Sequence, residues 1–276
     1  MTTPQNTKAL LSAEFLRQLN TSESNAKDGE GNHNRIPRTS AQHLRVTSVL
    51  ANLFADTKPL YLFVDASEEM GFSGVPGVRP TKFDFARQAA AAVGYAGLRQ
   101  GQRICVAGLG QTQGRRVPVL QGPDSALALL SYWEGLRGGG NHGFLPALRQ
   151  HVRRASAPGV CVVMSDFLNP RWEQAIRVLL TRQFDVVLLQ IVDPAECDSH
   201  PLALQWGSDQ GTFRPVDVTP GVAVRCQRAF EIFCRQIAAY AQQTGMTYAR
   251  VSTDAPIERL VLEALHFSPK TTQHSR

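Results

Sequence analysis

Residues 60–70 read LYLFVDASEEM, and this stretch sets the fold that the rest of the chain must complete. Its first five residues, Leu60–Val64, are all apolar, which is typical of a strand buried on both faces of a parallel sheet. Asp65 follows at once and begins a polar turn. In open parallel sheets, ligands bind at the carboxyl ends of the strands. The stretch therefore predicts a central strand with a candidate binding turn directly after it.

Downstream of this strand, short apolar runs alternate with helical patterns. Phe83, Ala86, Ala90, Val93 and Gly97 have the spacing of one helical stripe, and their small members allow close packing against a sheet. This alternation predicts an α/β fold of the Rossmann-like kind, a doubly wound and mostly parallel sheet with helices on both faces. Further strands are predicted at 104–107, 117–120 (an edge strand), 160–164, 185–192 and 247–251, and further helices twice between 123 and 155 and at 171–182, 222–244 and 256–267.

The chain divides into three parts by composition. Residues 59–267 carry the alternating pattern and form the main domain, with a small β excursion near 201–218. Residues 1–58 differ, because a short amphipathic helix between 10 and 19 is followed by a polar segment without apolar periodicity, which predicts flexibility. Residues 268–276 are predicted to be a disordered tail. We expect trimming to about residue 36 to leave thermal stability nearly unchanged.

The composition is that of an ordinary globular protein. The chain has 276 residues, of which 43% are hydrophobic and 19% are charged, and nothing approaches a run of roughly 18 apolar residues. The net charge of +6 comes from dispersed residues without a nucleic-acid motif, so no specific nucleic-acid partner is predicted. The five cysteines form no CxxC pair, and the first residues lack a secretory pattern. We therefore expect reduced thiols and a cytoplasmic location.

Two aspartates directly follow buried strands. Asp65 ends the first apolar run, and Asp166 comes after the run at 160–164. A carboxylate at such a place is partly desolvated, so it needs a metal ion, another cation or several N–H donors to stay charged. These two residues are the strongest candidates for a functional site.

The segments around these aspartates resemble a known family. The bacterial proteins classed as domain of unknown function 58 share the chain's pattern over roughly residues 58–267, although the family's usual upstream elements are not recognisable in residues 1–58. The resemblance implies a von Willebrand factor A-like fold and an association with MoxR-type AAA+ ATPases. The segments that carry it are LYLFVDASEEM at 60–70, KFDFAR at 82–87, LRQGQR at 98–103, SDF at 165–167, IVDPAE at 191–196 and VSTDAP at 251–256.

The resemblance also implies a metal-ion-dependent adhesion site, built from an Asp-x-Ser-x-Ser turn, a threonine and a further aspartate. Asp65, Ser67 and Asp166 match this pattern, but Glu69 stands in place of the second serine. The glycine-rich turn 138–143 offers Asn141 and His142 where threonine is expected, and imidazole is a poor ligand for Mg²⁺.

Three states of this site stay open: a conventional Mg²⁺ site, a modified one, or a site without an ion. A direct Glu69 ligand would add negative charge and fill the position that a partner's carboxylate should take. Without an ion, Asp65, Glu69 and Asp166 would crowd together, at about 4 kcal/mol for each pair 4 Å apart at an effective dielectric constant near 20. Relief would then require protonation, or a cation such as His142 or a nearby arginine.

The function predicted from the sequence is protein–protein interaction without catalysis, with a MoxR-type ATPase or its assembly as the partner. The binding surface is predicted around 65–72, 138–144 and 166–172, with Met70, Asn141, Phe167 and Trp172 as contact residues.

The alternative function is that of a metal-dependent hydrolase on a similar sheet. The sequence contains no P-loop, HExxH pair or GxSxG elbow. The glycines at 108–114 precede a strand-like run instead of the helix that a dinucleotide site needs.

Overall fold

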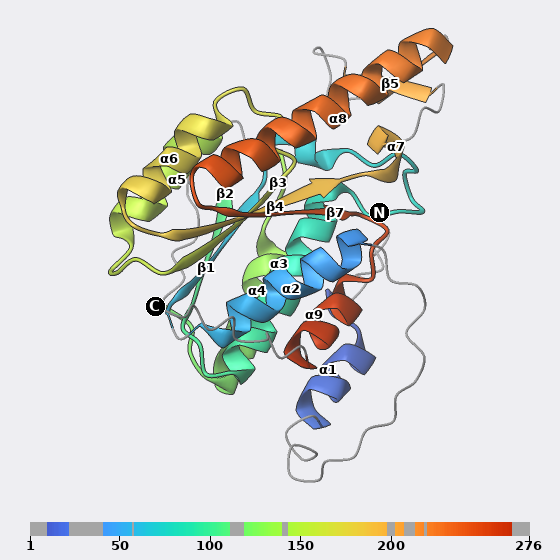
Figure 1. Cartoon of the computed structure of the whole chain (residues 1–276). Helices are drawn as coiled ribbons and strands as arrows, with labels where there is room; N and C mark the ends of the chain where they lie inside the picture. The colour runs from blue at the N-terminus through green and yellow to red at the C-terminus, as the bar shows by residue number, and fades with distance from the viewer. Residues whose placement is uncertain are drawn as a thin grey trace, which may run out of the picture.

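The computed structural model describes residues 10–21, 41–56, 58–110, 119–139, 143–197, 202–206, 213–217 and 220–266. Its centre is a five-stranded parallel sheet with the strand order β2-β1-β3-β4-β7 (Figure 1). β3 is the middle strand in this order, with β1 and β4 on either side, as expected from their apolar sequences. The predicted α/β fold with a parallel sheet is therefore confirmed. The strands are β1 (Leu60–Asp65), β2 (Ile104–Leu109), β3 (Val160–Ser165), β4 (Asp185–Val192) and β7 (Thr247–Ser252).

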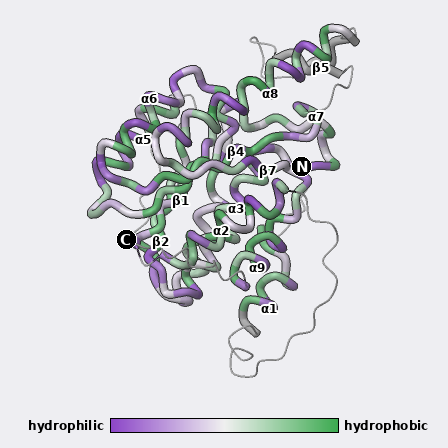
Figure 2. The backbone as a smooth tube through the Cα atoms, viewed as in Figure 1, coloured by the Kyte–Doolittle hydropathy of each residue, from purple (hydrophilic) through white to green (hydrophobic). Residues whose placement is uncertain are grey.

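Helices cover both faces of the sheet (Figure 1). One face carries α5 (Phe144–Arg154), α6 (Trp172–Thr181) and α8 (Pro220–Gln243). The other carries α1 (Ala13–Thr21), α2 (Ala41–Ala55), α3 (Lys82–Arg99), α4 (Ala126–Gly135) and α9 (Ile257–His266). In Figure 2 the tube along α5 and α6 alternates between hydrophilic and hydrophobic colours, as expected of helices with one face on the core and one in solvent.

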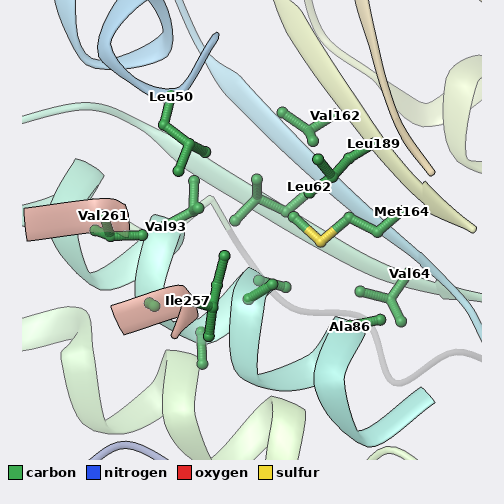
Figure 3. Packing of buried hydrophobic residues seen from close by; sticks show 14 of the residues in the cluster. Leu50, Leu62, Val64, Ala86, Val93, Val162, Met164, Leu189, Ile257 and Val261 are labelled. Atoms are coloured by element: carbon green, nitrogen blue, oxygen red, sulfur yellow. The ribbon is translucent and has the colours of Figure 1, made fainter. Parts of the chain in front are cut away.

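Alternate residues of β1 serve the two cores. Leu60, Leu62 and Val64 belong to the cluster that α2, α3 and α9 cover, while Tyr61 and Phe63 belong to the cluster under α5, α6 and α8. This follows from the twofold side-chain period of a strand. Figure 3 displays the first cluster, where β1 and β3 side chains point toward α3 and α9. Because both sides of β1 are buried, its continuous apolar sequence is required.

The connections add smaller elements. A 3-10 turn, η1 (Glu68–Gly71), follows β1, and a second one, η2 (Pro123–Ser125), precedes α4. A short helix, α7 (Pro194–Cys197), follows β4. The predicted β excursion is an antiparallel pair, β5 (Leu202–Trp206) and β6 (Phe213–Asp217). Of the predicted edge strand at 117–120, residues 117 and 118 lie outside the described residues, and Leu120 forms an isolated antiparallel bridge with Ile104.

The N-terminal part contains more structure than its sequence predicts. α1 confirms the expected amphipathic helix, and Leu11, Phe15 and Leu19 are buried. α2 was not predicted, yet Leu50 is 1% exposed and joins the same core. Its apolar residues are diluted by Thr, Ser, Asn and Gln, which weakened the helical signal. The boundary at residue 58 therefore does not separate the core from a peripheral segment.

Two expectations from composition can be compared with the structure. All five cysteines, each of which lies in a described part of the chain, are free of disulfide bonds. No helix within the described ranges combines the length and the apolar character needed to cross a membrane.

The packing of α1 yields a first prediction, which replaces the expectation that trimming to about residue 36 is harmless. Phe15→Ala removes a ring that is 1% exposed and should lower the free energy of unfolding by about 2 kcal/mol or more. Glu14→Ala, an exposed position on the same helix, is the control and should have little effect. Thermal and urea unfolding measure both variants. Equal stabilities of the two would contradict the docking of α1.

Candidate functional site

Three aspartates meet at the carboxyl edge of the sheet. Asp65 ends β1, Asp166 follows β3 and Asp193 follows β4, and these three strands are neighbours. All three residues are buried, with relative exposures of 2%, 3% and 0%. Buried carboxylates need hydrogen-bond donors or cations as partners, so the partners of each carboxylate indicate what the site can bind.

Asp65 is held by hydrogen bonds from its own turn and from β3. The Ser67 backbone N–H donates to Asp65 Oδ1 at 2.9 Å, and the Ser165 hydroxyl donates to Oδ2 at 2.6 Å. Burial raises the pKa of Asp65 to about 6, the nearby charge of Asp166 adds to this rise, and the serine hydrogen bonds oppose it. Asp65 is thus a carboxyl group whose two protonation states balance near pH 6.

Asp166 is held differently, by a buried lysine. The Leu168 backbone N–H donates to Asp166 Oδ1 at 3.0 Å, and the ammonium of Lys82 donates to Oδ2 at 2.7 Å. The same ammonium donates to Glu196 Oε1 at 2.8 Å. The Lys82 side chain is 1% exposed, so the structure brings one cation and two carboxylates together out of water.

The charge on Lys82 is stabilised by these two neighbours. Burial acts to lower the pKa of Lys82, but the negative charges of Asp166 and Glu196 and their hydrogen bonds outweigh it, so the pKa lies above its ordinary value. The Phe72 ring also faces the ammonium, with its centroid 5.4 Å from Nζ. Lys82 is therefore a permanent cation in the folded protein at neutral pH.

The position of Lys82 follows from local sequence. Thr81 caps α3 by accepting a hydrogen bond from the Asp84 backbone N–H, which makes Lys82 the first residue of the helix. A cation is unfavourable beside the positive end of a helix dipole. Its place there is explained by Asp166 and Glu196, which supply more favourable interactions than the helix end removes.

Glu196 is positioned by a capping box in the sequence Asp193-Pro194-Ala195-Glu196. Asp193 Oδ1 accepts from the Ala195 N–H at 2.9 Å, and Glu196 Oε2 accepts from the Asp193 N–H at 2.8 Å. The other oxygen of Glu196 is left for Lys82. Burial raises the pKa of Glu196, and the Lys82 ammonium opposes this rise.

Gly74 lets the connection between η1 and α3 lie directly on α7. A Cβ atom at this position would come within 2.6 Å of Asp193 Oδ1 and 2.4 Å of Ala195 Cβ. Only glycine allows this approach without a shift of the backbone. The loop before Lys82 and the helix that carries Glu196 are thus packed together as well as ion-paired.

The Ser165-Asp166-Phe167 turn has an unusual backbone. Phe167 has φ +60°, the left-handed region that non-glycine residues seldom adopt. Its N–H donates to the Ser165 hydroxyl at 2.9 Å, and its ring packs edge-on against Trp172. The turn thereby buries Phe167 and exposes Leu168, which is 44% exposed.

The structure brings together only part of the predicted site. Asp65 and Asp166 adjoin as expected, and the backbone of Ser67 contacts Asp65. Glu69 instead lies exposed on η1, so the predicted crowding of Asp65, Glu69 and Asp166 does not occur. The 3-10 turn explains this correction, because it directs Glu69 to solvent while its neighbour Met70 enters the core.

Three predicted partner contacts are buried in the protein's own core. Met70 is 0% exposed, Phe167 is 1% exposed and Trp172 is 7% exposed. Met70 packs under α3, while Phe167 and Trp172 fill the space under α5, α6 and α8. A side chain already engaged in the core cannot also contact a partner, so these assignments are corrected. Asn141 and His142 lie outside the described residues.

Sequence reasoning missed Lys82, Ser165 and Glu196 as site residues. All three lie in segments that carry the family resemblance, at 82–87, 165–167 and 191–196, but nothing in those segments marks them as site residues. The Asp-x-x-Glu spacing is a capping signal that could have located Glu196. No local signal pairs it with a lysine that is 114 residues away.

The arrangement does not fit a divalent ion bound by Asp166. An ammonium already occupies one Asp166 oxygen, and Mg²⁺ at about 4 Å from that ammonium would be repelled by about 8 kcal/mol at an effective dielectric constant near 20. Within the described ranges, no group of three histidine, cysteine, aspartate or glutamate side chains is placed to hold a metal ion. The cation that Asp166 was predicted to require is supplied in this structure by the Lys82 ammonium.

Comparison with known proteins gives one family. The family model described as "Protein of unknown function DUF58" matches residues 37–206, which include α2 and the whole of β1, β3 and β4. The closing segment 251–256, quoted above for the same resemblance, lies beyond the matched range. No curated protein matches the chain.

The buried Asp65 generates a prediction about pH. Its folded-state pKa of about 6 exceeds the ordinary value of 3.8, so the folded protein holds a proton that the unfolded chain releases. The contribution of Asp65 to wild-type stability should therefore fall by about 2 kcal/mol as the pH rises from about 4 to about 6.

The variant Asp65→Asn tests this prediction. It removes the titrating group, so at pH 7 in EDTA it should be more stable than the wild type, while at low pH the two should converge. Glu68→Gln removes an exposed carboxylate from the same turn and serves as the control. Urea unfolding across this range measures the three proteins. A less stable Asp65→Asn variant at pH 7 would contradict the account.

Proposed function

Because this chain belongs to the DUF58 family, we propose that it is a non-catalytic protein-interaction domain whose binding face is the carboxyl edge of the sheet. The observation that carries the proposal is the ion-paired cluster of Lys82, Asp166 and Glu196. In a catalytic site such charged groups would be free to contact substrate. Here they pair with one another and join the start of α3, the turn after β3 and α7. A surface made rigid by such ion pairs is suited to protein recognition, because it loses little conformational freedom on binding.

Exposed apolar side chains beside the cluster support the same function. Val75 is 40% exposed and Val78 is 79% exposed, and both lie on the connection that leads to Lys82. Leu168 is 44% exposed and lies two residues after Asp166. Exposed apolar side chains that gather in one place mark surfaces for protein interaction. They replace Met70, Phe167 and Trp172 as the proposed contact residues.

The proposed partner is a MoxR-type AAA+ ATPase or the assembly on which it acts. The family resemblance supports this partner. The exposed carboxylates of Glu68 and Glu69 on η1 would complement a basic rim on that partner. The proposal places the protein in the bacterial cytoplasm, where its five free cysteines would stay reduced.

Substitutions on this edge test the proposal. Val78→Asp and Leu168→Asp place charge on the proposed surface without touching the core, and each should weaken binding to a purified MoxR-type ATPase from the same organism by about tenfold or more. Leu127→Asp is the matched control, because Leu127 is 76% exposed but lies on α4. Calorimetry measures the dissociation constants. Equal affinities for all three variants and the wild type would contradict the proposed face.

The alternative is a metal-dependent hydrolase on this sheet. The raised pKa of Asp65 favours it, because strongly perturbed carboxyl groups gather at catalytic sites. If the protein is such a hydrolase, it should hydrolyse a phosphoester or a peptide in the presence of Mg²⁺, and the Asp65→Ala variant should lose this activity.

A further inference from the structure

The cluster around Lys82 supports an inference that does not depend on any partner. The resemblance implies a divalent ion at the carboxyl edge of this sheet. Asp166, which matches the further aspartate of the adhesion-site pattern, is instead bound to an ammonium from the protein itself. We propose that Lys82 is a built-in cation that takes the place of the divalent ion, so that this edge of the sheet keeps its shape without metal.

The contacts of the ammonium satisfy its bonding capacity. It donates to Asp166 at 2.7 Å and to Glu196 at 2.8 Å, and the face of the Phe72 ring lies on a further side. A lysine ammonium has three N–H donors and no acceptor, so little of it is left for an external ligand. With 1% of its side chain exposed, Lys82 is an internal part of the site.

The ammonium also links the segments that a bound ion would link. Lys82 begins α3, Asp166 lies in the connection after β3, and Glu196 lies in α7 after β4. The Lys82 backbone N–H further donates to the Phe72 carbonyl at 3.0 Å, which joins the η1 connection to the same point. One monovalent cation therefore holds together segments that follow three neighbouring strands.

Removal of the ammonium should reveal a latent metal site. Asp166 Oδ2 and Glu196 Oε1 both face the place that the ammonium fills, so two carboxyl groups would remain there without a cation. Hard divalent cations bind clusters of carboxylate oxygens together with water. Lys82→Ala deletes the competing charge and leaves space for an ion with its water ligands.

The experiment measures Mn²⁺ binding to the EDTA-treated full chain by calorimetry and by thermal unfolding. Wild type should show no binding and no shift of its melting temperature in millimolar Mn²⁺. Lys82→Ala should bind Mn²⁺ with a dissociation constant at least about tenfold below the concentration at which wild type shows no binding, and it should gain stability from the ion. The double variant Lys82→Ala/Asp166→Asn should lose that gain.

Two further variants serve as a control and as a second substitution of Lys82. Lys58→Ala removes an ammonium that pairs with Asp185 at the opposite edge of the sheet, where both side chains are more than half exposed, and it should gain no Mn²⁺ binding. Lys82→Gln keeps most of the side-chain volume and covers the case in which the alanine variant unfolds without metal. For either Lys82 variant, recovery of the folded state on addition of Mn²⁺ counts as the expected gain.

Two results would overturn the proposal. One is Mn²⁺ binding by wild type that is lost in Asp166→Asn, which would place an ion beside the lysine. The other is failure of Mn²⁺ to stabilise either Lys82 variant. Neither result involves a partner protein, so the proposal can fail while the proposed interaction function stands.

Discussion

The structure depends on the burial of one charge, the ammonium of Lys82 between Asp166 and Glu196. A lysine that is 1% exposed is unfavourable alone, and two carboxylates in the same place are unfavourable without it. Each member of the cluster therefore requires the others. The cluster joins the start of α3 to the turn after β3 and to α7, which also lies against the loop at Gly74. The shape of the candidate binding edge is a consequence of this charge balance.

Buried ion pairs contribute little net stability compared with apolar side chains of the same volume. Their effect is geometric, because an alternative arrangement would leave a charge without a partner. In this fold the stability comes from the two cores on either side of β1, which hold the sheet and its helices in place. Figure 3 shows the core on the side of α3 and α9. The cluster adds specificity at the sheet edge, where side chains such as Leu168 and Val78 are presented to solvent.

Most of the sheet was predictable because its strands are apolar runs of suitable length. β1, β3 and β4 agree with the predicted ranges to within one residue, since burial on both faces leaves a continuous local signal. Asp65 and Asp166 were predictable for a similar reason, because each directly follows such a strand. Glu69 was assigned to the site because the expected pattern has a serine there, whereas the 3-10 turn directs its side chain to solvent. Lys82 could not be assigned from sequence, because its partners lie 84 and 114 residues away.

In this structure the cation that binds Asp166 is the ammonium of Lys82. The most direct test is a crystal structure of the wild-type protein grown with Mn²⁺ and measured at a wavelength where manganese scatters anomalously. We expect electron density for the Lys82 ammonium between Asp166 and Glu196, with no anomalous peak beside Asp65 or Asp166. A manganese peak bonded to either aspartate, with Lys82 turned away, would contradict it.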